Sequence, residues 1–322
     1  MARDHEEGRG RMRDFLVKRI LQAVGVVICI SAITFFVLNI VPGDPVRTMM
    51  GDMADEQTIE QVRHTMGLDR PVPEQYATWF SNMVRGDFGT SYTQNKSVAL
   101  LMGNAFAVTV RLAGFAYLFA LALGLAVGIV SAVCHGRAAD RILMALSIFG
   151  ISAPSFWVAI IIQIIFALNL RWFPLSGVKT AAAFVLPVIA LGTRYAASIA
   201  RVTRTSMLDV LNQDYMRTAE AKGLRKWSIV MVHGLRNALI PIITIAGTQL
   251  GDIFTGSILI ESVFAMPGMG KLLLDAINAR DLPLIEGGVM YIAIICVVVY
   301  LLVDILYAVV DPRIRLGGEA AE

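Results

Sequence analysis

Six long apolar stretches run through this chain, and most of its polar residues lie between them. The stretches are Ile20–Val41, Phe106–Val133, Ile142–Leu170, Ala181–Ile199, Pro241–Val263 and Gly288–Val310. A helix needs roughly 20 apolar residues to cross a hydrocarbon layer about 30 Å thick, and every stretch is close to that length or longer. Barrel strands would instead be short and would alternate apolar with polar residues. The pattern therefore predicts an all-α polytopic membrane protein with six transmembrane helices.

Composition and charge support a membrane location. Of the 322 residues, 56% are hydrophobic and only 16% are charged, whereas soluble domains average about 25% charged residues. With the N-terminus inside, Lys and Arg are nearly twice as numerous in the inner connecting segments as in the outer ones. The positive-inside rule then places both termini in the cytoplasm. Basic residues are not interleaved with aromatic ones, so nucleic acid is not an expected partner.

The connecting segments suggest four parts. Residues 1–41 would hold the cytoplasmic N-terminus and the first transmembrane helix, and 42–105 an extracytoplasmic loop domain. Residues 106–311 would form a core of five packed helices with a cytoplasmic loop at about 205–240, and 312–322 a cytoplasmic tail. The apolar run near the N-terminus is too long for the core of a signal peptide, so we expect the first helix to be retained.

The loop domain has a recognisable internal pattern. It opens with the turn sequence PGDP (Pro42–Pro45), and a first amphipathic helix is expected over Glu56–Met66. A second helix carries an apolar stripe at helical spacing, made of Tyr76, Trp79, Phe80 and Met83. This stripe could be a platform for a ligand. We favour the simpler interpretation that it packs on the outer ends of the membrane helices.

Glycine and proline mark special positions within the spans. Gly124 and Gly128 form a G-x-x-x-G spacing, which predicts a close approach to another helix. Pro154 and Pro187 lie inside apolar spans, where each predicts a kink because proline removes a backbone donor.

Charged residues inside spans are costly and usually face a cavity or a partner. Arg194 and Asp252 are the candidates for a translocation pathway or an interface. For Arg194 the alternative is extension of the side chain to the membrane surface, and for Asp252 it is a buried structural pair. Arg111 is expected to reach the outer surface. Glu261, at the outer end of its span, is expected to be solvated or to contact a loop.

The stretch DYMRTAEAKGLRKW, Asp214 to Trp227, is a short polar helix between two apolar spans. Asp214 is a plausible N-cap, Tyr215–Lys222 the helix, and Gly223 its terminator. So short a helix is marginal in water and needs packing for stability. Met216, Ala219 and Gly223 share one small face that a partner could approach. An ordinary solvated loop is the alternative, but docking into a groove of another protein explains both the small face and the flanking basic residues.

DYMRTAEAKGL, together with LRNALIP (Leu235–Pro241), resembles the EAA motif of permease subunits of bacterial ABC importers. The similarity is greatest to the oligopeptide/dipeptide/nickel group. Further matches to that group follow in the expected order along nearly the whole chain: FVLNIVPGDPV (Phe36–Val46), GDFGTSY (Gly86–Tyr92), ARVTRTSMLDVL (Ala200–Leu211), ESVFAMPGMGKLL (Glu261–Leu273), ARDLPLIEG (Ala279–Gly287) and VDPRIR (Val310–Arg315).

This resemblance implies that Tyr215–Lys222 is the coupling helix, which seats in a cleft of a cytoplasmic ATPase. The small positions of the motif match Ala219, Ala221 and Gly223. Many members carry a basic residue where Glu220 stands, so no particular ion pair is implied there. The residues implied in ATPase coupling are Tyr215, Met216, Arg217, Ala219, Glu220, Ala221, Lys222, Gly223 and Leu224.

The same resemblance implies the type I ABC importer permease fold in the bacterial cytoplasmic membrane. The implied partners are a second, related permease, two ATPase subunits and an extracytoplasmic solute-binding protein. ATP and Mg would be bound by the ATPases, with no cofactor in this chain. The implied cargo is a di- or oligopeptide, or a related small solute such as a nickel chelate, glutathione or an opine.

Other classes of function remain open on the residues alone. The chain has no G-x-x-x-x-G-K-[ST] loop, so we expect neither ATP hydrolysis nor a catalytic residue in it. Its four His are scattered over both membrane sides, which argues against a metal site. An ion-coupled secondary transporter would want inverted repeats and midplane ion ligands, for which Asp252 alone is thin support. A non-transporting membrane scaffold would need some other protein to bind the polar helix.

Overall fold

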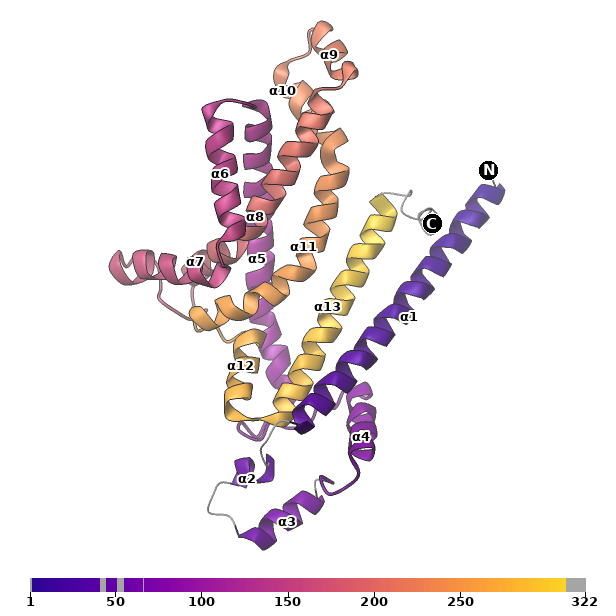
Figure 1. Cartoon of the computed structure of the whole chain (residues 1–322), viewed down its shortest axis with the longest axis vertical. Helices are drawn as coiled ribbons and strands as arrows, with labels where there is room; N and C mark the ends of the chain where they lie inside the picture. Colours follow the sequence, from indigo (N-terminus) through magenta and orange to yellow (C-terminus); the bar gives the residue numbers. More distant parts are fainter. Residues whose placement is uncertain (1, 41–44, 51–54, 66, 311–322) are drawn as a thin grey trace. The chain divides into compact units, whose positions relative to one another are not determined.

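The computed structural model of the chain describes residues 2–40, 45–50, 55–65 and 67–310. Most of the predicted turn at Pro42–Pro45 and the whole predicted tail at 312–322 lie outside them. The described part is helical apart from its connections (Figure 1). Within the described residues, five segments are long and apolar enough to cross a membrane: Val17–Leu38 within α1 (Ala2–Ile40), α5 (Val98–Val133), α8 (Ala182–Leu211), Lys226–Val263, which ends in α11 (Arg236–Val263), and Leu282–Ile305 within α13 (Leu282–Val310). The all-α polytopic class is confirmed.

The third predicted span is not one straight helix. α6 (Ala138–Ser152) is followed by a second segment, made of α7 (Ser155–Ile162) and a π-helical end at Gln163–Asn169, and the two meet at 105° (Figure 1). The break falls at Ala153 and Pro154, both of which have extended backbone. A residue before proline avoids the helical region, and proline has no N–H to continue the ladder. The kink expected at Pro154 is therefore a break, whereas α8 continues through Pro187.

The chain divides into two compact units. The first joins Met1–Val108 with Pro267–Leu301, and the second joins Thr109–Met266 with Leu302–Glu322. The expected division into four parts, with all five later spans in one core, stays a prediction. An apolar cluster holds the first unit together, and in it α12 (Met269–Ala279) and the start of α13 pack with the start of α5. Its buried members include Val98, Met102, Met269, Ala276 and Leu284.

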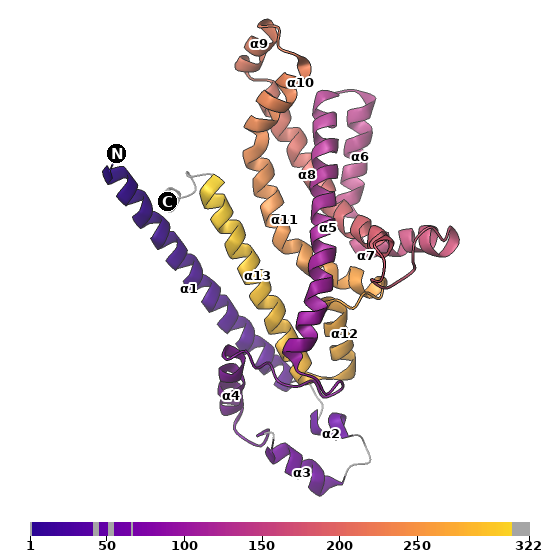
Figure 2. The ribbon, with the colours of Figure 1, turned by 180° about the vertical axis from the view of Figure 1, so that it is seen from behind.

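The aromatic stripe of the loop domain packs within the first unit. After α2 (Pro45–Met50), the two expected helices are present as α3 (Glu56–Thr65) and α4 (Val72–Val84). α4 lies beside the end of α1 (Figure 2). The ring centroid of Phe35 is 5.4 Å from that of Tyr76 and 5.6 Å from that of Trp79. The hydroxyls of Ser31 and Tyr76 are 2.8 Å apart. The packing interpretation is confirmed for Tyr76 and Trp79.

Asp281 anchors the loop before α5. Its buried carboxylate accepts hydrogen bonds from the hydroxyls of Ser91, at 2.6 Å, and Thr93, at 2.7 Å, and from the amides of Tyr92 and Thr93. It also accepts a longer bond, 3.4 Å, from the amide of Leu284 at the start of α13. Burial opposes ionisation, but these donors outweigh it and hold the pKa of Asp281 below its usual value.

α8 is the central helix of the second unit, with α6, α7 and α11 packed on it. Gly124 and Gly128 of α5 also lie directly against it. A Cβ at Gly128 would lie 2.5 Å from the Cβ of Thr203, and one at Gly124 would lie 2.8 Å from the carbonyl oxygen of Ala196. The close approach predicted from the G-x-x-x-G spacing is confirmed, and its partner is α8.

One of the two expectations for Glu261 is wrong. It was predicted to be solvated or to contact a loop, and solvation is excluded because its side chain is fully buried in the second unit. Thr109 donates a hydrogen bond to its Oε1 at 2.6 Å, and Ser257 donates to the same atom at 3.3 Å. A carboxylate near a helix end is buried here because these hydroxyls from α5 and α11 replace the water that it loses.

Candidate functional site

The polar helix is present as α9 (Asp214–Ala221), between the end of α8 and the short α10 (Lys226–Ser228). The N-cap is Gln213, with extended backbone, and not Asp214 as expected. The helix begins one residue early because the amide of Met216 bonds the Gln213 carbonyl at 3.0 Å. Asp214 then lies in the first turn, where a negative charge is favourable to the helix dipole.

The C-terminus of α9 is built as predicted. Gly223 has φ +75°, in the left-handed region that favours glycine. Its amide bonds the carbonyl of Glu220 at 2.9 Å, and the amide of Leu224 bonds the carbonyl of Ala219 at 3.4 Å. These two bonds are those of a Schellman motif. A Cβ at Gly223 would meet no atom of the chain within 4 Å.

One side chain holds α9 against its own chain. Met216 is only 2% exposed, and α9 packs on the π-helical segment Ile229–Leu235 that precedes α11. The face of Met216 and Ala219 was expected to be open to a partner, but the structure turns Met216 inward and leaves Ala219 half-buried. An eight-residue helix needs such an anchor, because its own hydrogen bonds do not stabilise it in water.

The outer surface of α9 and the turn after it is exposed. It consists of Tyr215, Arg217, Glu220, Ala221, Lys222, Gly223 and Leu224. Trp227 is 73% exposed, and sequence analysis did not single it out. An exposed tryptophan among basic residues is a signal that could have identified it, since tryptophan is enriched where proteins bind one another.

Arg194 and Asp252, predicted from their charge alone, lie together. Both are exposed and line one cavity of about 500 Å³ within the second unit, Arg194 from α8 and Asp252 from α11. The hydroxyl of Tyr195 donates to the carbonyl of Asp252 at 2.9 Å and links the two helices. Gln249 also lines this cavity. Its Oε1 is buried and accepts no hydrogen bond from any residue that the structure describes.

A charge cluster that sequence analysis missed joins the α5–α6 connection to α8. Arg204 donates two bonds to the buried carboxylate of Asp140, at 2.7 and 2.8 Å. Ser131 and the amide of Gly136 also donate to that carboxylate, and Nδ1 of His135 lies 3.1 Å from Arg204. The paired geometry fits the guanidinium fork. This cluster holds the ends of three helices together rather than facing the cavity.

Comparison with known proteins shows which protein families this chain resembles. Residues 124–316 match the family of binding-protein-dependent transport system inner membrane components, and residues 12–113 match the N-terminal family of such membrane components. A glutathione transport system permease protein, GsiC, from Pectobacterium atrosepticum is 40% identical over 94% of this chain and 99% of its own length. The GsiC protein of Escherichia coli is 39% identical with the same coverage.

Solved structures agree on the fold. The MetNI methionine ABC transporter in inward facing conformations matches with a TM-score of 0.53 and 17% identity, over 66% of this chain and 97% of that one. An amino acid ABC transporter with histidines matches with a TM-score of 0.50 and 16% identity, over 66% and 94%. The chain therefore belongs to the family of inner membrane components of binding-protein-dependent transport systems, as a non-enzymatic permease subunit of an ABC importer.

Proposed function

We propose that this permease imports glutathione, or a short peptide of similar size and charge, and that α9 couples it to cytoplasmic ATPases. The single observation that supports glutathione as the cargo is the match, over 94% of the chain, to two permeases named for glutathione transport. Nickel chelates and opines have no comparable support.

The cavity of the second unit suits such a cargo. Glutathione is a small zwitterion with one ammonium group and two carboxylates. A wall that carries both a guanidinium, from Arg194, and a carboxylate, from Asp252, offers each charge an opposite partner. The unsatisfied Oε1 of Gln249 adds an acceptor for an ammonium or amide N–H. The walls of this cavity come from α8 and α11, with Ile151 of α6, so α8 and α11 are proposed to line most of the pathway.

For coupling, we assign distinct roles to the residues of α9. Met216, which is buried, and Ala219, which is half-buried, hold the helix on its own chain. Tyr215, Arg217 and Leu224 are proposed to enter the ATPase cleft with the other exposed residues, Glu220, Ala221, Lys222 and Gly223. ATP and Mg are bound by the ATPases and not by this chain. Closure of the ATPase dimer moves α9, and that movement opens the pathway outward.

Three further partners complete the proposed importer. A second, related permease forms the other half of the pathway, two ATPases bind at α9 and its counterpart, and a solute-binding protein delivers cargo outside the cell. The exposure of Arg194 and Asp252 on this chain alone supports a second permease, because charged side chains within a membrane normally face a cavity or a partner.

The test is uptake by the complete importer in proteoliposomes. The complex is purified with this chain as bait, its subunits are identified by mass spectrometry, and labelled glutathione uptake is measured with ATP on the ATPase side. We expect ATP-dependent uptake that unlabelled short peptides compete for and nickel chelates do not. A complex that carries ATPases but transports only another solute would overturn the cargo. Absence of any ATPase from an intact preparation would overturn the coupling role of α9.

A further inference from the structure

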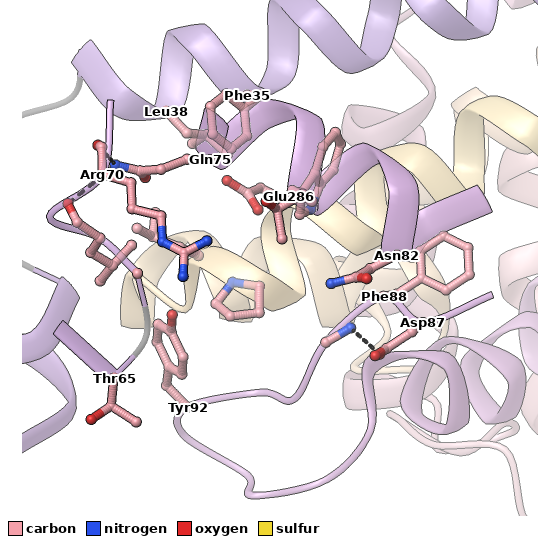
Figure 3. A pocket seen from close by; sticks show the side chains of 17 residues that line it. Phe35, Leu38, Thr65, Arg70, Gln75, Asn82, Asp87, Phe88, Tyr92 and Glu286 are labelled. Atoms are coloured by element: carbon pink, nitrogen blue, oxygen red, sulfur yellow. Dashed lines mark hydrogen bonds between the residues drawn. The ribbon is translucent and has the colours of Figure 1, made fainter. Parts of the chain in front are cut away.

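A second cavity, of about 470 Å³, lies wholly within the first unit. It is lined by the end of α1, by the connection between α3 and α4, by α4, by the loop before α5 and by the start of α13 (Figure 3). Phe35, Trp79 and Phe88 give it an aromatic wall. Its volume falls within the range of about 300–1,000 Å³ that is typical of small-molecule sites. Nothing in the proposed transport pathway of the second unit uses it.

One carboxylate in this cavity, that of Glu286, has no partner among the described residues. Glu286 is in the second turn of α13, half-buried, and points into the cavity (Figure 3). Among the residues that the structure describes, none donates a hydrogen bond to it or forms an ion pair with it. Holding a carboxylate away from water without a cation is costly. The cavity therefore favours a ligand that brings a positive charge.

The neighbouring tyrosine lies close enough to the same carboxylate to interact with it. Burial is the main cause that raises the pKa of Tyr92 to about 12, and the carboxylates of Glu286 and Asp281 add to the increase. Tyr92 lines the cavity, and its amide is fixed by Asp281 at 3.1 Å. The contribution of the two carboxylates to this shift is the part that would also stabilise an ammonium group, whereas burial disfavours either charge. The hydroxyl of Tyr92 and the amide of Asn82, which both face the cavity in Figure 3, can complete the hydrogen bonding of a polar ligand.

The cavity also carries a cation. The guanidinium of Arg70 extends into it (Figure 3). The backbone of this segment is fixed by Gln75, whose amide donates to the carbonyls of Arg70, at 2.8 Å, and Leu68, at 3.1 Å. Gly67 has φ +67°, and a Cβ built on it would lie 3.4 Å from Nε of Arg70, so the Arg70 side chain passes close to this glycine. The cavity thus presents an anion and a cation from separate elements, together with aromatic rings.

We infer that this cavity binds a peptide-sized zwitterion, with the ammonium group at Glu286 and a carboxylate at Arg70. The inference rests on the proposed function in taking the cargo to be a short peptide or glutathione. With a cytoplasmic N-terminus, as the Lys and Arg distribution predicts, the cavity lies on the outer side, where cargo arrives. A lysine side chain of the binding protein would use only Glu286 and little of the volume. A ligand with both charges uses the whole site.

The test measures binding to the complete importer without its binding protein, in phosphatidylglycerol nanodiscs, by isothermal titration calorimetry. The probes are glutathione and its N-acetyl derivative, which lacks the ammonium group. We expect N-acetylation to weaken binding by at least about tenfold, since an unpaired buried charge is left behind. Because the second-unit cavity also offers an ammonium group the carboxylate of Asp252, the comparison is repeated with Asp252→Asn in place. In that background Glu286→Gln should weaken glutathione binding equally and abolish the difference between the two probes. Glu74→Gln removes an exposed carboxylate of α4 that does not line the cavity, and it should change nothing.

The outcomes separate this inference from the proposed function. If both probes bind the unaltered importer equally, or neither binds, the inference is overturned even where Glu286→Gln fails to assemble. Glutathione uptake is measured on the same preparation, so transport without ammonium-dependent binding refutes only the cavity. Ammonium-dependent binding without uptake of any peptide refutes only the cargo. If ethanolamine phosphate displaces glutathione and binds more tightly, the ligand is a lipid headgroup and the peptide assignment fails.

Discussion

Gly223 offers a test of how α9 is built, because the two usual effects of replacing a glycine, backbone strain and steric clash, are separate there. Its backbone is left-handed, with φ +75°, and the Schellman bonds of Gly223 and Leu224 depend on that conformation. The space around it is open within the chain. A substitution at Gly223 therefore acts on the permease through backbone strain and not through a clash.

The magnitude follows from the conformation. An L-residue such as alanine costs roughly 1–2 kcal/mol in the left-handed region, whereas asparagine is tolerated there. α9 has eight residues and one buried anchor, so it has little stability in reserve. If the ATPase binds only the formed helix, Gly223→Ala should weaken ATPase binding about 5- to 30-fold. Gly223→Asn should weaken it by less than about threefold, since most of the strain is absent.

The assay is the affinity of the purified ATPase for nanodiscs that carry the permease pair, together with ATP-driven uptake. Gly136→Ala is the matched control, because Gly136 also has φ +75° and open space around it but lies in the α5–α6 connection. Gly136→Ala should strain the backbone as much as Gly223→Ala does, without altering the affinity of the ATPase. If Gly223→Asn is as harmful as Gly223→Ala, backbone strain is not the cause, and direct contact at that position replaces it. If neither has an effect, α9 does not couple.

Three further predictions follow from packing and charge in the two units. The Cβ that Gly128→Ala adds would overlap α8, so this variant should destabilise the second unit by about 1–3 kcal/mol and lower its Tm in detergent. Gly114→Ala on the same helix is the control and should not lower the Tm, because a Cβ there would meet no described atom within 4 Å. Asp140→Asn leaves the guanidinium of Arg204 partly buried without its anion and should cost up to about 3–5 kcal/mol, measured by thermal unfolding. Asp281 has a lowered folded-state pKa, so its stabilisation is complete above about pH 4 and is lost as pH falls through that pKa. Asp281→Asn should destabilise the loop before α5 at neutral pH and remove this acid sensitivity in limited proteolysis.

Each of these has a contradicting result. Equal melting of the two glycine variants would mean that α5 does not approach α8 closely. An unchanged Tm for Asp140→Asn would mean that the charge cluster is solvated. Retention of the acid-dependent proteolysis after Asp281→Asn would assign the titration to another carboxylate.

Local features of this protein were accessible from sequence because their causes are local. The apolar runs predicted its helices, since a helix satisfies its own backbone groups in lipid. Gly223 was identified as the terminator of α9 because its conformation depends on its immediate neighbours. The cost of charge in a membrane singled out Arg194 and Asp252 without any knowledge of their surroundings.

The surroundings themselves depended on contacts between distant parts of the chain. Only the packing of α11 on α8 brings Arg194 and Asp252 to one cavity. Asp140 was missed because its partner Arg204 is 64 positions away. Met216 was expected to face a partner, because periodicity defines a helical face but does not show what covers it. In this structure the chain itself covers Met216.

The sequence by itself thus determined the class of protein, its helices and the conformation of single turns, because these follow from the solvent and from near neighbours. Tertiary structure decided which charges meet, which faces are covered and where cavities remain. The break at Pro154 shows the difference. Proline removes a donor wherever it occurs, but whether the helix bends or ends depends on the groups packed around it.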